Sequence, residues 1–64
     1  MLQTYREKQH QHYLDALSMG QRHLAVDAVW RAASEADLLA TDEVNGDKLT
    51  TERIIYLLEH LGWA

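Results

Sequence analysis

The chain has 64 residues without cysteine or proline, and its formal net charge is −4 because ten acidic side chains outnumber six basic ones. A domain this short buries only about 60% of the surface that its unfolded chain exposes, so it depends on close helix packing or on a partner chain. The lack of cysteine excludes disulfides and thiolate metal sites, and the lack of any run of Lys or Arg argues against a surface that follows nucleic-acid phosphates.

The first predicted helix covers residues 5–18 and begins with a capping box. Thr4 and Glu7 stand three residues apart, so the side chain of each can accept a hydrogen bond from the backbone N–H of the other. Tyr5, His10 and His12 lie on a mostly polar surface of this helix. An aromatic ring and an imidazole on such a surface favour a reversible, pH-sensitive contact with a partner.

Gly20 predicts a break after this helix, because glycine readily adopts the left-handed conformation that follows a helix end. Ser18 and Gln21 are also spaced to form a capping box for a second helix. One long kinked helix is the open alternative, since a glycine inside a helix costs only about 1 kcal/mol.

The second predicted helix covers residues 21–40 and is rich in alanine, the residue with the highest helix propensity. Its apolar side chains recur at steps of four and three residues, at Ala25, Val29, Ala32, Ala36 and Leu39. Small residues on one stripe let another helix come close, so we expect self-association through this helix. Trp30 stands beside the stripe and either covers the core of the chain or faces a second copy.

Residues 41–49 are predicted to form a turn, because Asn45-Gly46 favours left-handed backbone angles. The acidic residues around it resemble a calcium-binding loop. The required pattern fails in both registers: one puts Arg53 where a bidentate Glu is needed, and the other puts Lys48 at the apolar position. A solvated acidic loop without calcium is therefore expected.

The third predicted helix covers residues 51–61 and has signals at both ends. Thr50 can cap its first turn, and Gly62 can take the left-handed conformation that lets Trp63 fold back on Leu58. The apolar side chains expected to lie in the groove between the first two helices are Ile54, Leu57, Leu58 and Leu61. The sequence thus predicts an all-α, three-helix single domain over residues 1–64, which dimerisation would complete.

No combination of side chains indicates catalysis, a metal ion or a cofactor. His10 and His12 point about 200° apart on a helix and cannot hold one ion together. His23 and Asp27 have the correct four-residue spacing, but two ligands make only half a site. The sequence also lacks a glycine-rich phosphate loop and a nucleophile elbow, so we expect no enzyme.

No apolar stretch approaches the roughly 20 residues that span a bilayer, and the N-terminal residues lack the pattern of a secretory signal. A cytoplasmic protein without a membrane partner is therefore expected. A helix-turn-helix-like regulator that binds nucleic acid is the alternative, although Glu52 and Glu59 on the last helix make nucleic acid an unfavourable partner.

The remaining hypothesis is a non-catalytic protein–protein interaction module. It would be a small cytosolic regulator, adaptor or stoichiometric inhibitor that occludes a surface of another protein and forms a homodimer. Amphipathic aromatic residues anchor many such interfaces. The residues predicted to bind a partner or to mediate self-association are Tyr5, His12, Ala25, Val29, Trp30, Ala32, Ala36 and Tyr56.

Overall fold

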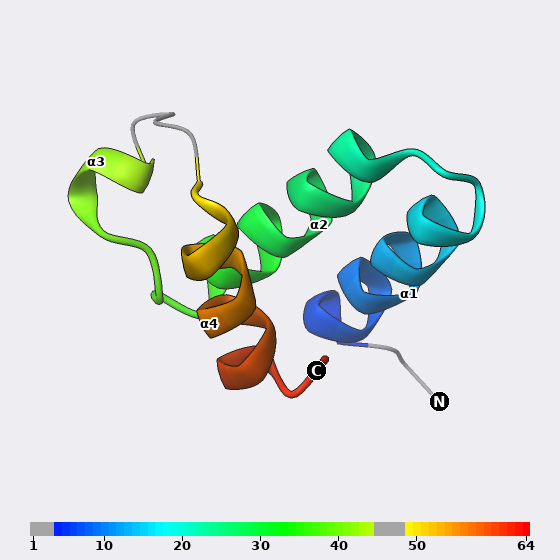
Figure 1. Ribbon diagram of the computed structural model, residues 1–64. Helices are drawn as coiled ribbons and strands as arrows, with labels where there is room; N and C mark the ends of the chain where they lie inside the picture. The colour runs from blue at the N-terminus through cyan, green and yellow to red at the C-terminus, as the bar shows by residue number, and fades with distance from the viewer. Residues whose placement is uncertain (1–3, 45–48) are drawn as a thin grey trace.

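The computed structural model describes residues 4–44 and 49–64 (Figure 1). Within these two ranges the chain forms four helices and no strand. The helices are α1 (Tyr5–Ser18), α2 (Arg22–Glu35), α3 (Thr41–Val44) and α4 (Thr51–Leu61). The predicted all-α class is confirmed, with three longer helices and one single-turn helix that the sequence analysis did not predict.

Local hydrogen bonds fix both ends of α1. The Oγ1 of Thr4 accepts from the N–H of Glu7 at 3.1 Å, as one half of the predicted capping box. Gly20 has a φ of 69°, and the N–H of Gln21 donates to the carbonyl of Ala16 at 2.8 Å. This Schellman motif confirms the predicted break. Gln21 precedes α2 without a side-chain capping bond, so the second capping box does not form.

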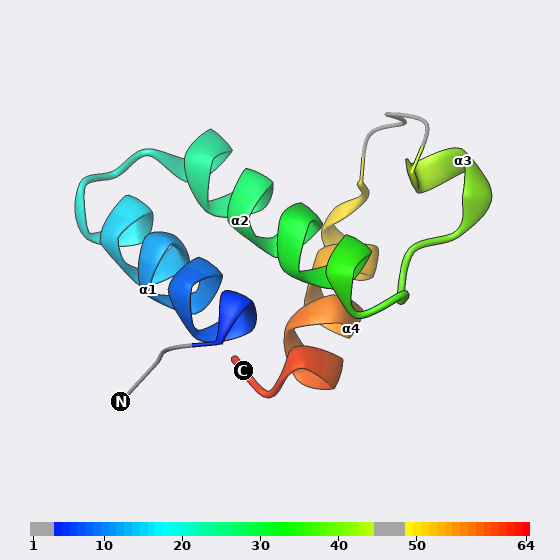
Figure 2. The same cartoon turned by 180° about the vertical axis from the view of Figure 1, so that it is seen from behind.

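The helices α1 and α2 form an antiparallel hairpin, which both views of the ribbon show (Figures 1 and 2). Buried small residues line the contact between them, among them Ala16, Ala25 and Ala28. Because the distance between packed helices depends on the side chains at the contact, alanine allows the two helices to lie close together. We call the end at Gly20 the closed end of the hairpin and the other end its open end.

The second helix ends at Glu35 and not at the predicted residue 40. Asp37 has a φ of 60°, and the N–H of Leu38 donates to the carbonyl of Ala33 at 2.9 Å. These bonds form another Schellman motif with an aspartate at the left-handed position. Aspartate adopts this conformation more readily than most residues, so a helix stop occurs without the glycine that usually announces it.

The predicted turn at residues 41–49 is wrong in its first part, because α3 occupies Thr41–Val44. The Oε1 of Glu43 accepts from the N–H of Ala40 at 2.8 Å, which satisfies a free donor at the start of this helical turn. The predicted turn at Asn45-Gly46 lies outside the described residues.

The bounds of α4 agree with the prediction. The Oγ1 of Thr50 accepts from the N–H of Arg53 at 3.1 Å, and Gly62 has a φ of 77°. The N–H of Trp63 then donates to the carbonyl of Leu58 at 2.9 Å. Capping and the Schellman motif therefore set both ends of this helix as expected.

The core lies where α4 packs against the C-terminal half of α2. Its buried members are Val29, Ala32, Ala33, Leu57 and Leu61. The predicted placement of the last helix between the first two is correct only in part. Leu57 and Leu61 are buried, whereas Ile54 and Leu58 keep part of their surface exposed. Trp63, which follows α4 in the chain, reaches the open end of α1 and stacks on His10.

Candidate protein-binding surfaces

An open apolar groove of about 400 Å³ lies between the hairpin and α4. We call it the groove surface and define it by its apolar side chains: Tyr13, Leu17, Val26, Ile54, Ile55 and Leu58. The small residue Ala25 and the core residue Val29 also line it, and Arg22 provides a charge at the closed end. A concave and mostly apolar lining is typical of sites that bind other molecules.

The groove surface exists because α4 covers only part of the hairpin. The side chains of Leu57 and Leu61 are directed into the core, while Ile55, on another side of the helix, is 50% exposed. At the closed end Leu17 remains 48% exposed. The apolar stripe of α4 is therefore wider than its contact with α2, and its outer flank becomes one wall of the groove.

A second hollow, of about 300 Å³, lies on the other side of the seam between α1 and α2. We call it the back surface and define it by its exposed side chains: His12, Asp15, Met19, Leu24, Asp27 and Arg31. Its floor contains the buried residues Ala16 and Ala28. Both signs of charge and two large apolar side chains therefore surround a shallow floor of small residues.

Three aromatic side chains close the open end of the hairpin. The ring of Trp63 stacks on that of His10 with a centroid distance of 4.8 Å and an interplanar angle of 9°. Tyr13 lies against the same indole at 5.5 Å. Stacked aromatic pairs contribute about 0.5–1.5 kcal/mol beyond the area they bury, so this cluster links the end of the chain to α1.

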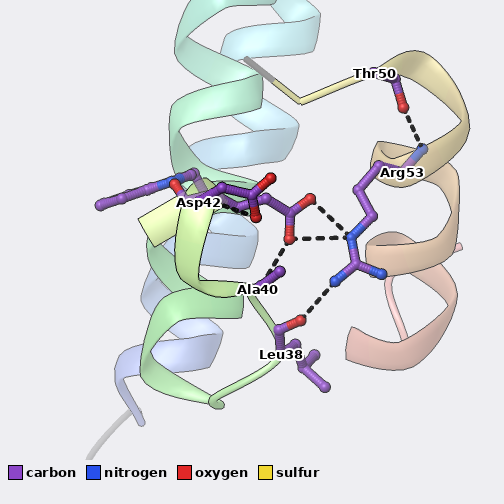
Figure 3. Close-up of polar contacts among 7 residues, drawn as sticks. Leu38, Ala40, Asp42, Thr50 and Arg53 are labelled. Atoms are coloured by element: carbon purple, nitrogen blue, oxygen red, sulfur yellow. Dashed lines mark hydrogen bonds and ion pairs between the residues drawn. The ribbon is translucent and has the colours of Figure 1, made fainter. Parts of the chain in front are cut away.

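An ion pair between Arg53 and Glu43 joins α4 to the connection that precedes it, and Figure 3 shows the contacts of Arg53. The Nε of Arg53 donates to Oε2 of Glu43 at 2.9 Å, and its Nη2 donates to the carbonyl of Leu38 at 2.8 Å. The backbone carbonyl of Glu43 accepts from Nε1 of Trp30 at 3.1 Å, which also ties α2 to α3. Side chains from two helices therefore hold α3 in place.

These contacts change the pKa of both charged groups. The hydrogen bond from Arg53, followed by that from the N–H of Ala40, lowers the pKa of the Glu43 carboxyl from its ordinary value of 4.5. The hydrogen bond to Glu43 raises the pKa of the Arg53 guanidinium. Both groups are consequently charged at neutral pH, and Arg53 is engaged within the chain.

Tyr56 lies on the exposed side of α4 in a small stack of its own. The guanidinium carbon of Arg53 lies 4.6 Å from the centroid of its ring, and the ring of His60 stacks on it at 4.0 Å. The Nδ1 of His60 donates to the backbone carbonyl of Tyr56 at 2.9 Å. The exposed Tyr56 is therefore held in a defined orientation, as a binding anchor requires.

The eight residues predicted to bind a partner are divided between core and surface. Those with almost no exposed surface are Ala25, Val29 and Ala32. Their side chains pack within the chain, so the alanine stripe joins α2 to α1 and α4. The partly exposed members are Trp30 and Ala36, and the exposed ones are Tyr5, His12 and Tyr56. Of the exposed members only His12 belongs to one of the two hollows.

Sequence periodicity does not indicate most of the apolar side chains that line the hollows, such as Leu17, Met19, Leu24 and Ile55. Leu24 and Ile55 stand beside the periodic apolar stripes and not on them. An apolar residue outside the stripe of an amphipathic helix was the available signal, because such a residue becomes exposed when the stripe is buried.

Within residues 4–44 and 49–64, no group of three or more metal-ligating side chains comes together. No helix in the same ranges is long and apolar enough to cross a bilayer. The comparison with known proteins adds no assignment: no protein family, no curated protein and no solved structure matches this chain significantly.

Proposed function

We propose that this protein is a non-catalytic interaction module, a small cytosolic regulator, adaptor or stoichiometric inhibitor. It binds a partner protein through the groove surface and occludes the segment that it binds. The observation that carries the proposal is the open apolar groove, in which Leu17 and Ile55 remain about half exposed although the chain has its own core elsewhere.

The apolar lining of the groove fits the apolar face of a helix. Its walls are helices, and its lining is aliphatic on both sides, with Tyr13 of α1 as its aromatic member. Amphipathic helices bind such grooves through residues spaced by three and four positions. Complete burial of a Leu or Ile side chain contributes about 1.5–3 kcal/mol, so covering the exposed halves of Leu17 and Ile55 contributes roughly 1 kcal/mol each.

Charges at the edges of the groove give the partner an orientation. Arg22 lies at the closed end of the hairpin, whereas Glu52 and Glu59 flank Ile55 on α4 at spacings of three and four residues. Residues at these spacings share one side of a helix. A partner helix with an acidic end near Arg22 and basic residues near α4 satisfies both edges, and such complementarity favours one orientation.

The chain also forms a homodimer in this proposal. Its buried apolar residues are mostly alanines, together with Val29, Leu57 and Leu61. Several larger apolar side chains stay exposed at the same time, including Leu14, Met19 and Leu24. Because a small core leaves a short domain marginally stable, burial against a second copy supplies the contacts that the single chain lacks.

A matched pair of variants tests the groove surface. Ile55 and Val44 are β-branched residues with nearly equal exposure, 50% and 49%, but only Ile55 lines the groove. Purified protein serves as bait in a lysate of the native host, and bound proteins are quantified by mass spectrometry. Ile55→Glu should lose the specific partner, because an unpaired carboxylate would enter an apolar contact. Val44→Glu should retain it.

Equal recovery of the same proteins by both variants would contradict the groove as the binding site. Far-UV circular dichroism of each variant shows whether it remains helical. Binding to nucleic acid is tested separately on heparin at low salt. With Arg53 engaged by Glu43 and a net charge of −4, we expect no retention.

A further inference from the structure

Two charged side chains of the back surface form no ion pair within the part of the chain that the structure describes. Asp27 and Arg31 stand one turn apart on α2, and neither forms an ion pair with any residue that the structure describes. The exposed side chains beside them include Met19, which is 64% exposed, and Leu24. A surface with both signs of charge and exposed apolar residues can complement a copy of itself.

His12 lies midway, along the hairpin, between the residues that we expect to pair across an interface. The two antiparallel helices meet at the Gly20 turn, so His12, six residues before the end of α1, lies close to the level of Ala28, six residues after the start of α2. Ala28 stands between Asp27 and Arg31, and all four residues line the hollow. Tyr5 and Met19 precede and follow His12 by seven residues, and a helix returns to nearly the same side after seven. The side of α1 that carries the back surface therefore has its midpoint at His12, with Met19 inside the hollow and Tyr5 beyond it at equal distances from His12.

We infer that the back surface is the contact between two copies of this chain. The two-fold axis lies in the interface, runs at right angles to the helices and crosses the hairpin at the level of His12. It places α1 on α1 and α2 on α2 of the second copy, each pair antiparallel, and the two hairpins form a four-helix bundle. This inference rests on the proposed self-association and not on the groove surface.

The two-fold axis brings two kinds of unlike residues into contact, one pair on α2 and one pair on α1. On α2, Asp27 of each copy faces Arg31 of the other, because the axis passes midway between these positions. On α1, Tyr5 of each copy meets Met19 of the other, and a thioether beside an aromatic ring is a favourable contact. The groove surface lies across the α1–α2 seam and stays open, so one dimer presents two grooves.

The available area predicts a reversible dimer. A 14-residue helix is about 21 Å long, so a face of two adjacent helices covers roughly 400 Å² in projection. Stable complexes bury about 800 Å² per partner. Each copy also carries a net charge of −4, which opposes association. Equilibrium sedimentation should therefore be run from low micromolar to millimolar concentrations.

Charge exchange between the two positions tests the register. Arg31→Asp places two acids on each copy and Asp27→Arg places two basic residues there, so each variant alone should dimerise roughly tenfold more weakly or worse. An equimolar mixture of the two variants should form a heterodimer, since every pair across the axis is then complementary. All substitutions are at exposed positions, and circular dichroism shows that each chain remains helical.

The possible results distinguish between dimerisation itself, this particular interface and the binding of a partner in the groove. A wild-type chain that stays monomeric at every concentration would overturn both the dimer and this interface. A wild-type dimer that is unaffected by either charge variant, or a mixture that forms no heterodimer, would overturn the interface alone. Neither result would affect the binding of a partner in the groove, which Ile55→Glu tests separately.

Thiol cross-linking provides a second measurement, because the chain has no cysteine of its own. Tyr5 and Met19 are about 21 Å apart along one helix, too far for a disulfide within a chain. Mild oxidation of Tyr5→Cys/Met19→Cys should give a covalent dimer. The matched control Tyr5→Cys/Ser18→Cys moves one thiol about 100° around the helix and should cross-link much more slowly. Equal rates for both would contradict the interface.

Discussion

The two ends of the α1–α2 hairpin differ in how their apolar residues are used. At the open end, Leu57 of α4 is fully buried against α2, and Trp63 stacks on His10. At the closed end, Leu17 and Met19 remain largely exposed. The chain thus concentrates its stabilising contacts at one end and leaves apolar surface for partners at the other.

Helix length explains this division. The 11 residues of α4 make a helix about 16 Å long, which crosses α2 and does not run along the whole hairpin. Burial of Leu57 and Leu61 therefore leaves the residues near Gly20 uncovered. Substitutions at the open end should change the free energy of unfolding, whereas those at the closed end should change binding.

The largest expected effect is that of Ala32→Glu. Ala32 has no exposed surface and lies on the side of α2 that packs against α4. A carboxylate there would be buried without a partner. We expect a loss of several kcal/mol in the free energy of unfolding, measured by urea denaturation. His23→Glu, at an exposed position of the same helix that lines neither hollow, should change it by less than about 0.5 kcal/mol. Equal stability of both variants would show that α2 faces water at position 32.

Leu57→Ala should have the next largest effect, about 2–5 kcal/mol, because it removes a fully buried side chain and leaves a cavity. Leu17→Ala is the matched control at the closed end. It removes the same atoms from a half-exposed position and should cost under about 1.5 kcal/mol. Similar losses in the two variants would remove the distinction between the ends of the hairpin.

Gln9→Leu should stabilise the protein. Gln9 is only 6% exposed, and its Oε1 finds no hydrogen-bond partner among the described residues. A buried acceptor without a partner costs about 1–3 kcal/mol, and a leucine of similar size avoids that cost. Each kcal/mol corresponds to roughly 4–8 °C in the melting temperature of so small a domain. Gln11→Leu, at an exposed position on the same helix, should not raise it.

The smallest effect concerns Glu43 and depends on pH. The pKa of Glu43 is lowered in the folded chain from its ordinary value of 4.5, so its ion pair with Arg53 stabilises the fold above that pH. This contribution is lost as the pH falls through the lower pKa of the folded state. Melting curves from pH 7 to pH 3 should therefore show the difference between the wild type and Glu43→Gln shrinking in acid. Arg53→Gln should lose the larger part of this pH-dependent contribution and keep the part that the N–H of Ala40 provides. A constant difference between the wild type and Glu43→Gln across the range would contradict the ion pair as a source of stability.

The bounds of α1 and α4 were predictable because each rests on local chemistry that the sequence displays. Threonine precedes both helices, and Gly20 and Gly62 follow them with positive φ. The end of α2 was not predictable in this way. Asp37 takes the left-handed position there, and the alanine-rich sequence before it favours continuation of the helix.

The binding surfaces were less predictable than the helices. Periodicity identifies the apolar stripe of α2 but not the helix that covers it, so the sequence does not show that Ala25 and Val29 are buried within the chain. The position of α4 decides which residues remain uncovered. It depends on contacts between segments far apart in the sequence, such as those of Leu57 with α2.

The stack of Trp63 on His10 has a consequence for synthesis on the ribosome. The α1–α2 hairpin can form as soon as α2 has left the exit tunnel. The side of α2 that carries Ala32 and Ala33 stays exposed to solvent until α4 has also emerged. The contact between α1 and the segment after α4 cannot form before residue 63 is available. Newly made chains therefore pass through a stage in which the apolar side of α2 is exposed. A chaperone or an early-binding partner would encounter the protein first in that state.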